Sequence, residues 1–182
     1  MRKLLNEELN RLTTEEFKSV DKIPVVIVLD NVRSMNNIGS IFRTSDAFRI
    51  SSLMLCGITA CPPHKDIHKT ALGATESVSW EYFENTQDAL KTLKNEGYEI
   101  GAIEQTEGSI SIDKFKVDTQ KKYALVFGHE VRGVQQRIVD KSDFALEIPQ
   151  FGTKHSLNIS VCAGIVIWHF YNQFSGAIMD MQ

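Results

Sequence analysis

The chain has 182 residues, 42% of them hydrophobic, and a formal net charge of −3. This length predicts one domain that buries its own core, and the slightly acidic balance excludes a uniformly basic coat for nucleic acid while allowing a local basic patch. The three cysteines form no Cys-x-x-Cys pair, so reduced thiols are favoured over a disulfide framework or a zinc knuckle.

The first twenty residues are predicted to form a helical lead-in. Leucines and Phe17 recur among charged residues over positions 3–18, which is the approximate spacing of an amphipathic helix. Acidic residues interrupt these apolar positions, unlike the continuous apolar core of a signal peptide, so we expect a cytoplasmic protein. The expected organisation is a lead-in at residues 1–20 and a single domain at residues 21–182.

Strand and helix patterns alternate through the rest of the chain. Residues 25–29 are a continuous run of Val, Ile and Leu, which is typical of a strand buried on both faces of a parallel sheet. Asn37 is a suitable N-cap for a helix that extends to about residue 48. Further strands are predicted at residues 53–56, 80–83, 98–103, 123–127 and 144–148, and further helices at residues 69–73, 87–95 and 134–139. This order indicates an α/β fold with a mainly parallel sheet flanked by helices.

The most apolar late segment spans residues 159–170. A bilayer span needs roughly 20 apolar residues, and this segment is shorter, so we interpret it as a buried helix and expect no membrane partner.

Two strand ends carry polar residues that indicate a binding site. One predicted strand is followed by Gly128 and Glu130, and the last one by a loop that contains Ser156 and Asn158. Because ligands of α/β proteins bind at the carboxyl ends of parallel strands, these loops predict a small-molecule site. The alternative for Glu130 is a loop carboxylate in a salt bridge, and for Ser156 or Asn158 it is capping of the next helix.

Other kinds of site have less support. Neither a glycine-rich phosphate loop nor a Gly-x-Ser-x-Gly nucleophile turn is present. His64 and His68 are four residues apart, as two metal ligands on a helix can be, but the prolines before them favour a basic surface loop. No third ligand is evident, so we expect no metal. Taken alone, Asn37 and Arg43 are a helix cap and a surface cation as readily as site residues.

Three segments together resemble the motifs of the SpoU/TrmH family of RNA ribose 2′-O-methyltransferases. They are NNIGSIFRTSDAF at 36–48, LVFGHEVRG at 125–133 and IPQFGTKHSLNISV at 148–161. The resemblance covers nearly the whole chain and implies the SPOUT type of α/β fold, in which the C-terminal segment forms a trefoil knot at the cofactor pocket. It also implies S-adenosylmethionine as methyl donor, a tRNA or rRNA substrate, no metal, and a homodimer in which both subunits complete each site.

The resemblance assigns roles to individual residues. The catalytic positions are Asn37, Arg43, Glu130, Ser156 and Asn158. The cofactor positions, which would act mainly through backbone groups, are Ile103, Phe127, Gly128, Ile148 and Leu157. Arg43 would assist removal of the 2′-hydroxyl proton or grip an RNA phosphate, and Glu130 would orient Arg43 or the ribose. The chain departs from the family's usual residues at Ser34, Met35, Arg49, His129 and Gln150.

The substrate surface is expected in the loops at the rim of the site. Six cations there are candidates for phosphate contacts: Arg33, Arg49, Lys65, Lys69, Arg132 and Lys154. Two other functions stay open, namely a non-catalytic RNA-binding or ribosome-assembly protein of the same fold and a nucleotide-binding regulatory or metabolic domain.

Overall fold

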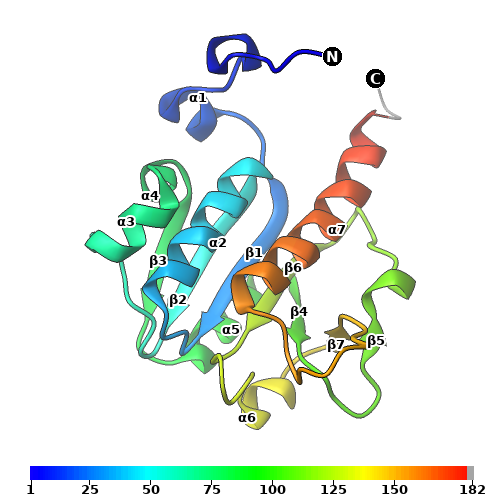
Figure 1. Ribbon diagram of the computed structural model, residues 1–182. Helices are drawn as coiled ribbons and strands as arrows, with labels where there is room; N and C mark the ends of the chain where they lie inside the picture. Colours follow the sequence, from blue (N-terminus) through cyan, green and yellow to red (C-terminus); the bar gives the residue numbers. More distant parts are fainter. Residues whose placement is uncertain (180–182) are drawn as a thin grey trace.

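A computed structural model describes residues 1–179, and its centre is a fully parallel seven-stranded sheet (Figure 1). Every recorded strand pair runs parallel, in the order β3-β2-β1-β6-β4-β7-β5. The strands are β1 (Ile23–Asp30), β2 (Ile50–Cys56), β3 (Ser79–Phe83), β4 (Tyr98–Ile103), β5 (Ile110–Ser111), β6 (Lys122–Phe127) and β7 (Phe144–Glu147). The prediction of an α/β fold with a mainly parallel sheet is confirmed.

Helices cover both faces of this sheet (Figure 1). The larger core cluster joins one face of the strands to α2, α3, α4 and α7, and the smaller cluster joins the other face to α5 and α6. The helices are η1 (Asn6–Leu9), α1 (Thr14–Ser19), α2 (Met35–Ala47), α3 (Lys65–Ala71), α4 (Ala74–Ser77), α5 (Thr86–Asn95), η2 (Ile112–Lys114), α6 (Gln136–Val139) and α7 (Ile159–Met179).

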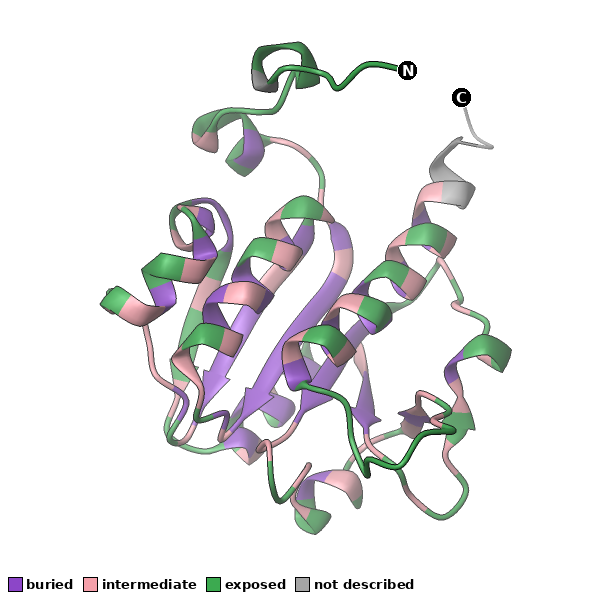
Figure 2. Cartoon of the chain, viewed as in Figure 1, coloured by how far each residue is buried: buried purple, intermediate pink, exposed green. Residues whose placement is uncertain are grey.

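The continuous apolar sequence of strand β1 is explained by its position in the sheet. Val25, Ile27 and Leu29 belong to the larger cluster, whereas Val26 and Val28 belong to the smaller one. Because successive side chains of a strand point to opposite faces, a central strand between two helical layers is buried on both sides. Figure 2 shows this burial along the middle of the sheet.

Several predicted boundaries are wrong. Ser34, not Asn37, caps α2, since its hydroxyl accepts a bond from the Asn37 N–H at 3.3 Å. The helix predicted at residues 69–73 is replaced by α3 and α4, and α3 begins just after His64, which caps it, so the predicted surface loop over residues 64–68 is wrong too. The short elements β5 and η2 were not predicted.

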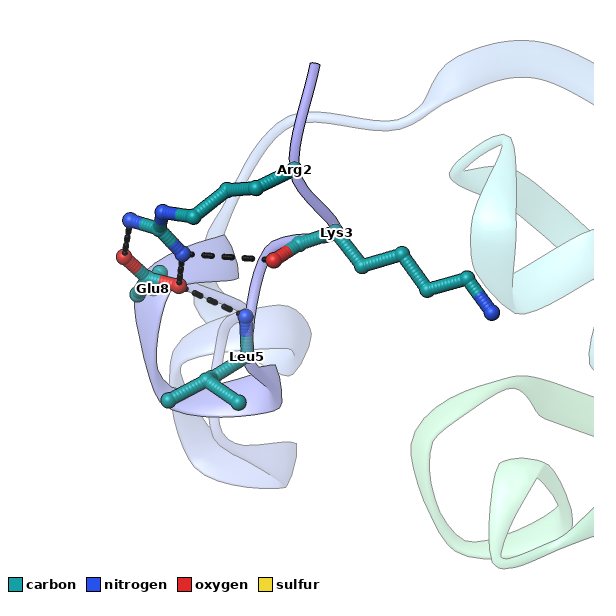
Figure 3. Close-up of polar contacts among 4 residues, drawn as sticks. All are labelled: Arg2, Lys3, Leu5 and Glu8. Carbon is teal, nitrogen blue, oxygen red and sulfur yellow. Dashed lines mark hydrogen bonds and ion pairs between the residues drawn. The ribbon is translucent and has the colours of Figure 1, made fainter.

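The lead-in forms two short helices instead of one. In η1, Glu8 pairs with Arg2 through contacts of 2.6 and 2.8 Å and also accepts the Leu5 N–H at 2.6 Å (Figure 3). The Arg2 guanidinium and this N–H lower the pKa of Glu8 to about 2. Thr13 and Glu16 form a capping box that starts α1, which anchors the segment through the buried Phe17.

Helix α7 continues nine residues beyond the predicted end of the apolar segment, to Met179. Val166, Ile167 and Phe170 of this helix are fully buried against the sheet, as the prediction of a buried helix required. None of the helices among residues 1–179 is both long enough and apolar enough to cross a membrane.

Candidate functional site

A cavity of about 900 Å³ opens at the carboxyl edge of the sheet, beside the ends of β4, β6 and β7. Its lining includes all five residues expected at a cofactor site: Ile103, Phe127, Gly128, Ile148 and Leu157. Two of the expected catalytic residues, Glu130 and Ser156, also line it. The parallel sheet accounts for this meeting, because it brings the ends of strands that are distant in sequence to one edge.

The loop after β6 is closed tightly on itself. The N–H groups of His129 and Gly133 bond to each other's carbonyl oxygens at 3.1 and 2.8 Å. Gly133 has φ 66°, in the left-handed region that favours glycine. A Cβ on Gly128 would lie 2.1 Å from the Gly133 carbonyl carbon, so the loop closes only because residue 128 has no side chain.

The His129 side chain stabilises the turn within this loop. Its Nδ1 accepts the N–H of Val131 at 3.0 Å and that of Arg132 at 3.4 Å. An Asn side-chain oxygen makes the same kind of bond to the backbone two residues on. The imidazole nitrogen therefore takes the place of an amide oxygen in the turn.

Two carboxylates, Glu104 and Asp30, tie the end of this loop to the sheet. Glu104, directly after β4, accepts the N–H groups of Val134 and Gln105, both at 2.9 Å. Asp30, the buried last residue of β1, accepts the Gln135 side-chain amide at 3.1 Å. Sequence reasoning assigned no role to either residue, although both are carboxylates at strand ends, which is the signal that singled out Glu130.

Asn37, Glu130 and Asn158 meet at the edge of the cavity, one from each motif. The Asn37 amide nitrogen donates to Glu130 at 3.3 Å, and its oxygen accepts the Asn158 amide at 3.2 Å. Asn37 is free to do this because Ser34 takes the capping position. Asn158 also caps α7, since its oxygen accepts the Ser160 N–H at 2.9 Å. The structure thus gives Asn158 both a capping contact and a contact within the site.

Glu130 is held as a charged acceptor. Its two oxygens receive the N–H groups of Arg33 at 3.0 Å and Ser34 at 2.8 Å, at the start of α2. Burial opposes the charge, but these N–H donors and Asn37 outweigh it, so the pKa of Glu130 lies below its ordinary value. A carboxylate in this state is a weak proton acceptor at neutral pH, which favours an orienting role.

This lowered pKa predicts a pH-dependent contribution to stability. The contribution is present above the ordinary pKa of 4.5 and is lost as the pH falls through the lower, folded-state pKa. We expect Glu130→Gln to lower the melting temperature at pH 7, and the difference from wild type to shrink below about pH 4. Thermal unfolding from pH 3 to pH 8 measures it. Glu81→Gln, at an exposed carboxylate of β3, is the control and should show no such trend. A constant difference for Glu130→Gln would contradict the prediction.

Arg43 does not join this cluster within one chain. It follows Asn37 by six residues, which is about 9 Å along α2 and about 120° around it. Gly39, one turn before Arg43 on the same side of the helix, faces α3, because a Cβ there would lie 2.3 Å from the Ile67 carbonyl oxygen. Arg43 is exposed, and among the described residues its guanidinium makes no hydrogen bond or ion pair.

The other residues predicted at the site lie partly at the cavity and partly elsewhere. Ser156 is exposed at the cavity, beside His155, which also lines it and which had been assigned no role. Of the expected rim cations, Arg33, Arg132 and Lys154 lie in loops that follow strands. Arg49 directly precedes β2 and so lies at the opposite edge of the sheet, and Lys65 and Lys69 belong to α3.

The cavity has an acidic lining. Its charged residues are Glu104, Glu107, Glu130, Asp140 and Glu147, against Arg132 alone. The loop after β6 offers few free backbone donors, since the N–H groups of His129 and of residues 131–135 are donated within the protein. Such a lining suits a cationic ligand better than an anion. Within residues 1–179, no group of three or more His, Cys, Asp or Glu side chains is placed to hold a metal ion.

Comparisons with known proteins agree on one family. Residues 24–168 match the model of the SpoU rRNA Methylase family. A tRNA/rRNA methyltransferase of Borreliella burgdorferi is 31% identical over 163 residues, which are 88% of this chain and 69% of that protein. A TrmH family tRNA/rRNA methyltransferase of Staphylococcus saprophyticus is 29% identical over 156 residues, 86% of this chain. The match spans only 61% of that relative's length.

Solved structures share the fold. The TrmH/SpoU tRNA modifying enzyme of A. aeolicus superposes with a TM-score of 0.79 at 28% identity, over 93% of this chain and 84% of that one. An AdoMet-bound rRNA methyltransferase of Sinorhizobium meliloti superposes with a TM-score of 0.77 at 24% identity, over 86% of this chain and 59% of that one.

Proposed function

Because the chain belongs to the SpoU rRNA Methylase family, we propose that it transfers a methyl group from S-adenosylmethionine to a ribose 2′-hydroxyl in tRNA or rRNA. The observation that carries this proposal is the cavity at the carboxyl edge, where the three motifs meet. Residues 21–182 would act as one methyltransferase domain in the cytoplasm. The trefoil knot implied by the motifs remains a prediction.

The cavity suits this methyl donor in size and charge. S-adenosylmethionine supplies an activated methyl group on a positively charged sulfonium, and five acidic side chains surround the space against one arginine. A volume of about 900 Å³ lies within the range of sites that bind cofactor-sized ligands. Backbone carbonyls around Phe127 and Ile148 would accept donors of the adenine ring, whatever the side chains are.

The polar cluster would position the nucleotide. Asn37, held between Glu130 and Asn158, presents a fixed amide at the cavity edge. Ser156, exposed at the lining, would hold the ribose or the cofactor loop. A hydroxyl must be aligned with the methyl group for direct transfer, and rigid hydrogen-bonded side chains provide that alignment. Glu130, already accepting three donors, would orient its neighbours and leave proton removal to another group.

Arg43 of a second subunit would assist that step. Arg43 is exposed and turned away from Glu130 of its own chain, towards the side of α2 that faces α3. Helix α7, which packs beside α2 on the same face of the sheet, carries the exposed apolar residues Val161, Ile165 and Trp168. A homodimer packed through the outer sides of α2 and α7 would bury these apolar residues and bring each Arg43 towards the opposite site. Its guanidinium would then grip an RNA phosphate or stabilise developing charge, while the hydroxyl proton leaves through that phosphate or water.

The dimer makes a direct prediction. Trp168 is 52% exposed and packs edge to face with Phe48, with ring centroids 5.5 Å apart. We expect Trp168→Glu to convert a dimer to a monomer at micromolar concentration, because a charge would be buried without a partner. Light scattering after gel filtration measures this. Ile58→Glu, at an exposed apolar residue of the β2–α3 loop, should leave the mass unchanged. A monomeric wild type would reject the dimer.

The test of the function begins with titration calorimetry of the full chain with S-adenosylmethionine. Methyl transfer to total RNA follows, and the RNA is digested to identify the modified nucleoside. A 2′-O-methylated nucleoside that is absent with Arg43→Ala is the expected result. If the protein binds the cofactor but methylates no RNA, the proposal that this chain acts alone as a methyltransferase is rejected. If it binds no cofactor, a non-catalytic RNA-binding protein is favoured.

A further inference from the structure

Phe151 is an aromatic side chain with almost no protein contact. It is 97% exposed, and every residue from 151 to 158 is exposed. It lies in the sequence between Gln150 and His155, both of which line the cavity, so its loop borders the cavity while its ring is exposed to solvent. A single exposed apolar side chain is common on protein surfaces, so what this ring indicates depends on the groups around it and on the binding site that its loop borders.

The surroundings of Phe151 are apolar and basic. Val131, 82% exposed, lies on the neighbouring loop and also lines the cavity. Arg33, Arg132 and Lys154 are exposed on the three strand-end loops around the mouth and form no ion pair with any other described residue. The acidic group of these loops, Glu130, is turned inward onto backbone N–H groups. A chain of net charge −3 thus presents unpaired cations here, next to an acidic cavity.

We propose that Phe151 is a stacking platform for a base of the RNA substrate, next to the nucleotide whose ribose enters the cavity. This inference rests on the proposed function. Single-stranded RNA is bound by aromatic rings that stack on bases together with cations that contact the backbone, and both kinds of group are present here. A protein partner would need a larger apolar surface than one ring and one valine.

The proposal separates two tasks at the site. The acidic cavity holds the methyl donor, and the rim with Phe151 holds the polynucleotide. Because every base has a face that can stack, the ring would fix the position of the strand without selecting a sequence. Loss of the ring should therefore weaken RNA binding and leave cofactor binding unchanged.

The experiment measures binding of a short single-stranded RNA that carries 2-aminopurine, whose fluorescence falls on stacking. Removal of one stacked contact should weaken binding by about 5-fold to 150-fold, so Phe151→Ala and Phe151→Leu are expected in this range. Phe151→Tyr should bind as wild type does, since it keeps the ring. Tyr82→Ala removes an exposed aromatic side chain of the edge strand β3 and is the matched control, expected to bind RNA normally.

Each outcome separates this inference from the proposed function. If wild type methylates RNA and Phe151→Ala binds the oligonucleotide equally well, the platform is rejected and the enzyme stands. If Phe151→Ala alters the mass of the protein in solution, the ring packs against a second copy and the platform is again rejected. If wild type binds the oligonucleotide through Phe151 but transfers no methyl group, the catalytic proposal fails and the platform stands. If wild type binds no RNA, both fail.

Discussion

A dimer assembled from two inactive variants, Arg43→Ala and Glu130→Ala, is expected to recover about half of the wild-type methyl transfer, because a two-fold dimer has two sites and one of them would be intact. The reason is the geometry of α2. Asn37 faces Glu130 of its own chain, whereas Arg43 lies about 120° away around the helix. Coexpression with two different tags, followed by tandem purification, isolates the mixed dimer for a methyl transfer assay.

A reciprocal dimer provides the control. It pairs a wild-type chain with a chain that carries both substitutions. If each site combines Arg43 of one subunit with Glu130 of the other, this dimer has one substitution in each site and should be inactive. If both residues act within one chain, the result reverses: the second dimer keeps about half of the activity and the first has none. The two preparations therefore give opposite results under the two arrangements.

Gly128→Ala is expected to weaken cofactor binding by about 100-fold. An added Cβ would lie 2.1 to 2.2 Å from backbone atoms of Gly133 and Val134, which cannot move unless the loop opens. Overpacking of this kind costs about 3 kcal/mol, which corresponds to a loss of affinity of about 100-fold. Titration calorimetry with S-adenosylmethionine measures the loss, and the circular dichroism spectrum shows whether the rest of the fold is retained.

Gly152→Ala is the matched control for this change. Gly152 lies in the loop of the third motif, and a Cβ there would meet nothing within 4 Å. It should bind the cofactor as wild type does. Equal losses for the two alanine variants, or wild-type affinity for Gly128→Ala, would show that the closed turn after β6 does not shape the cavity.

The long elements could be predicted from the sequence because their patterns depend on burial alone. The apolar run of β1 is explained by helices on both faces of the sheet, and β4 has the predicted limits at Tyr98 and Ile103. The two-residue strand β5 could not be found in this way, since Ile110 and Ser111 give no periodicity and their pairing with β7 depends on the assembled sheet.

The contacts within the site were less predictable. Ser34 and Asn37 are both good caps, and the choice between them depends on Glu130, which lies 93 residues after Asn37 and occupies its amide. Similarly, Glu104 acquires a role only when the loop after β6 folds back onto it. Arg49, by contrast, could have been placed correctly, because a residue that precedes a parallel strand lies at the edge away from the ligand.

The internal hydrogen bonds of the loop after β6 also determine which metabolites the cavity would not bind. Sites for ATP and related compounds hold their phosphates on free backbone N–H groups. Here those groups are already bonded, from Val131 to Gln135, and the charged groups around them are mostly acids. ATP, which is abundant in a cell, would therefore be repelled, although it shares an adenosine with the methyl donor. Competition from the cellular nucleotide pool would be weak without any dedicated gate.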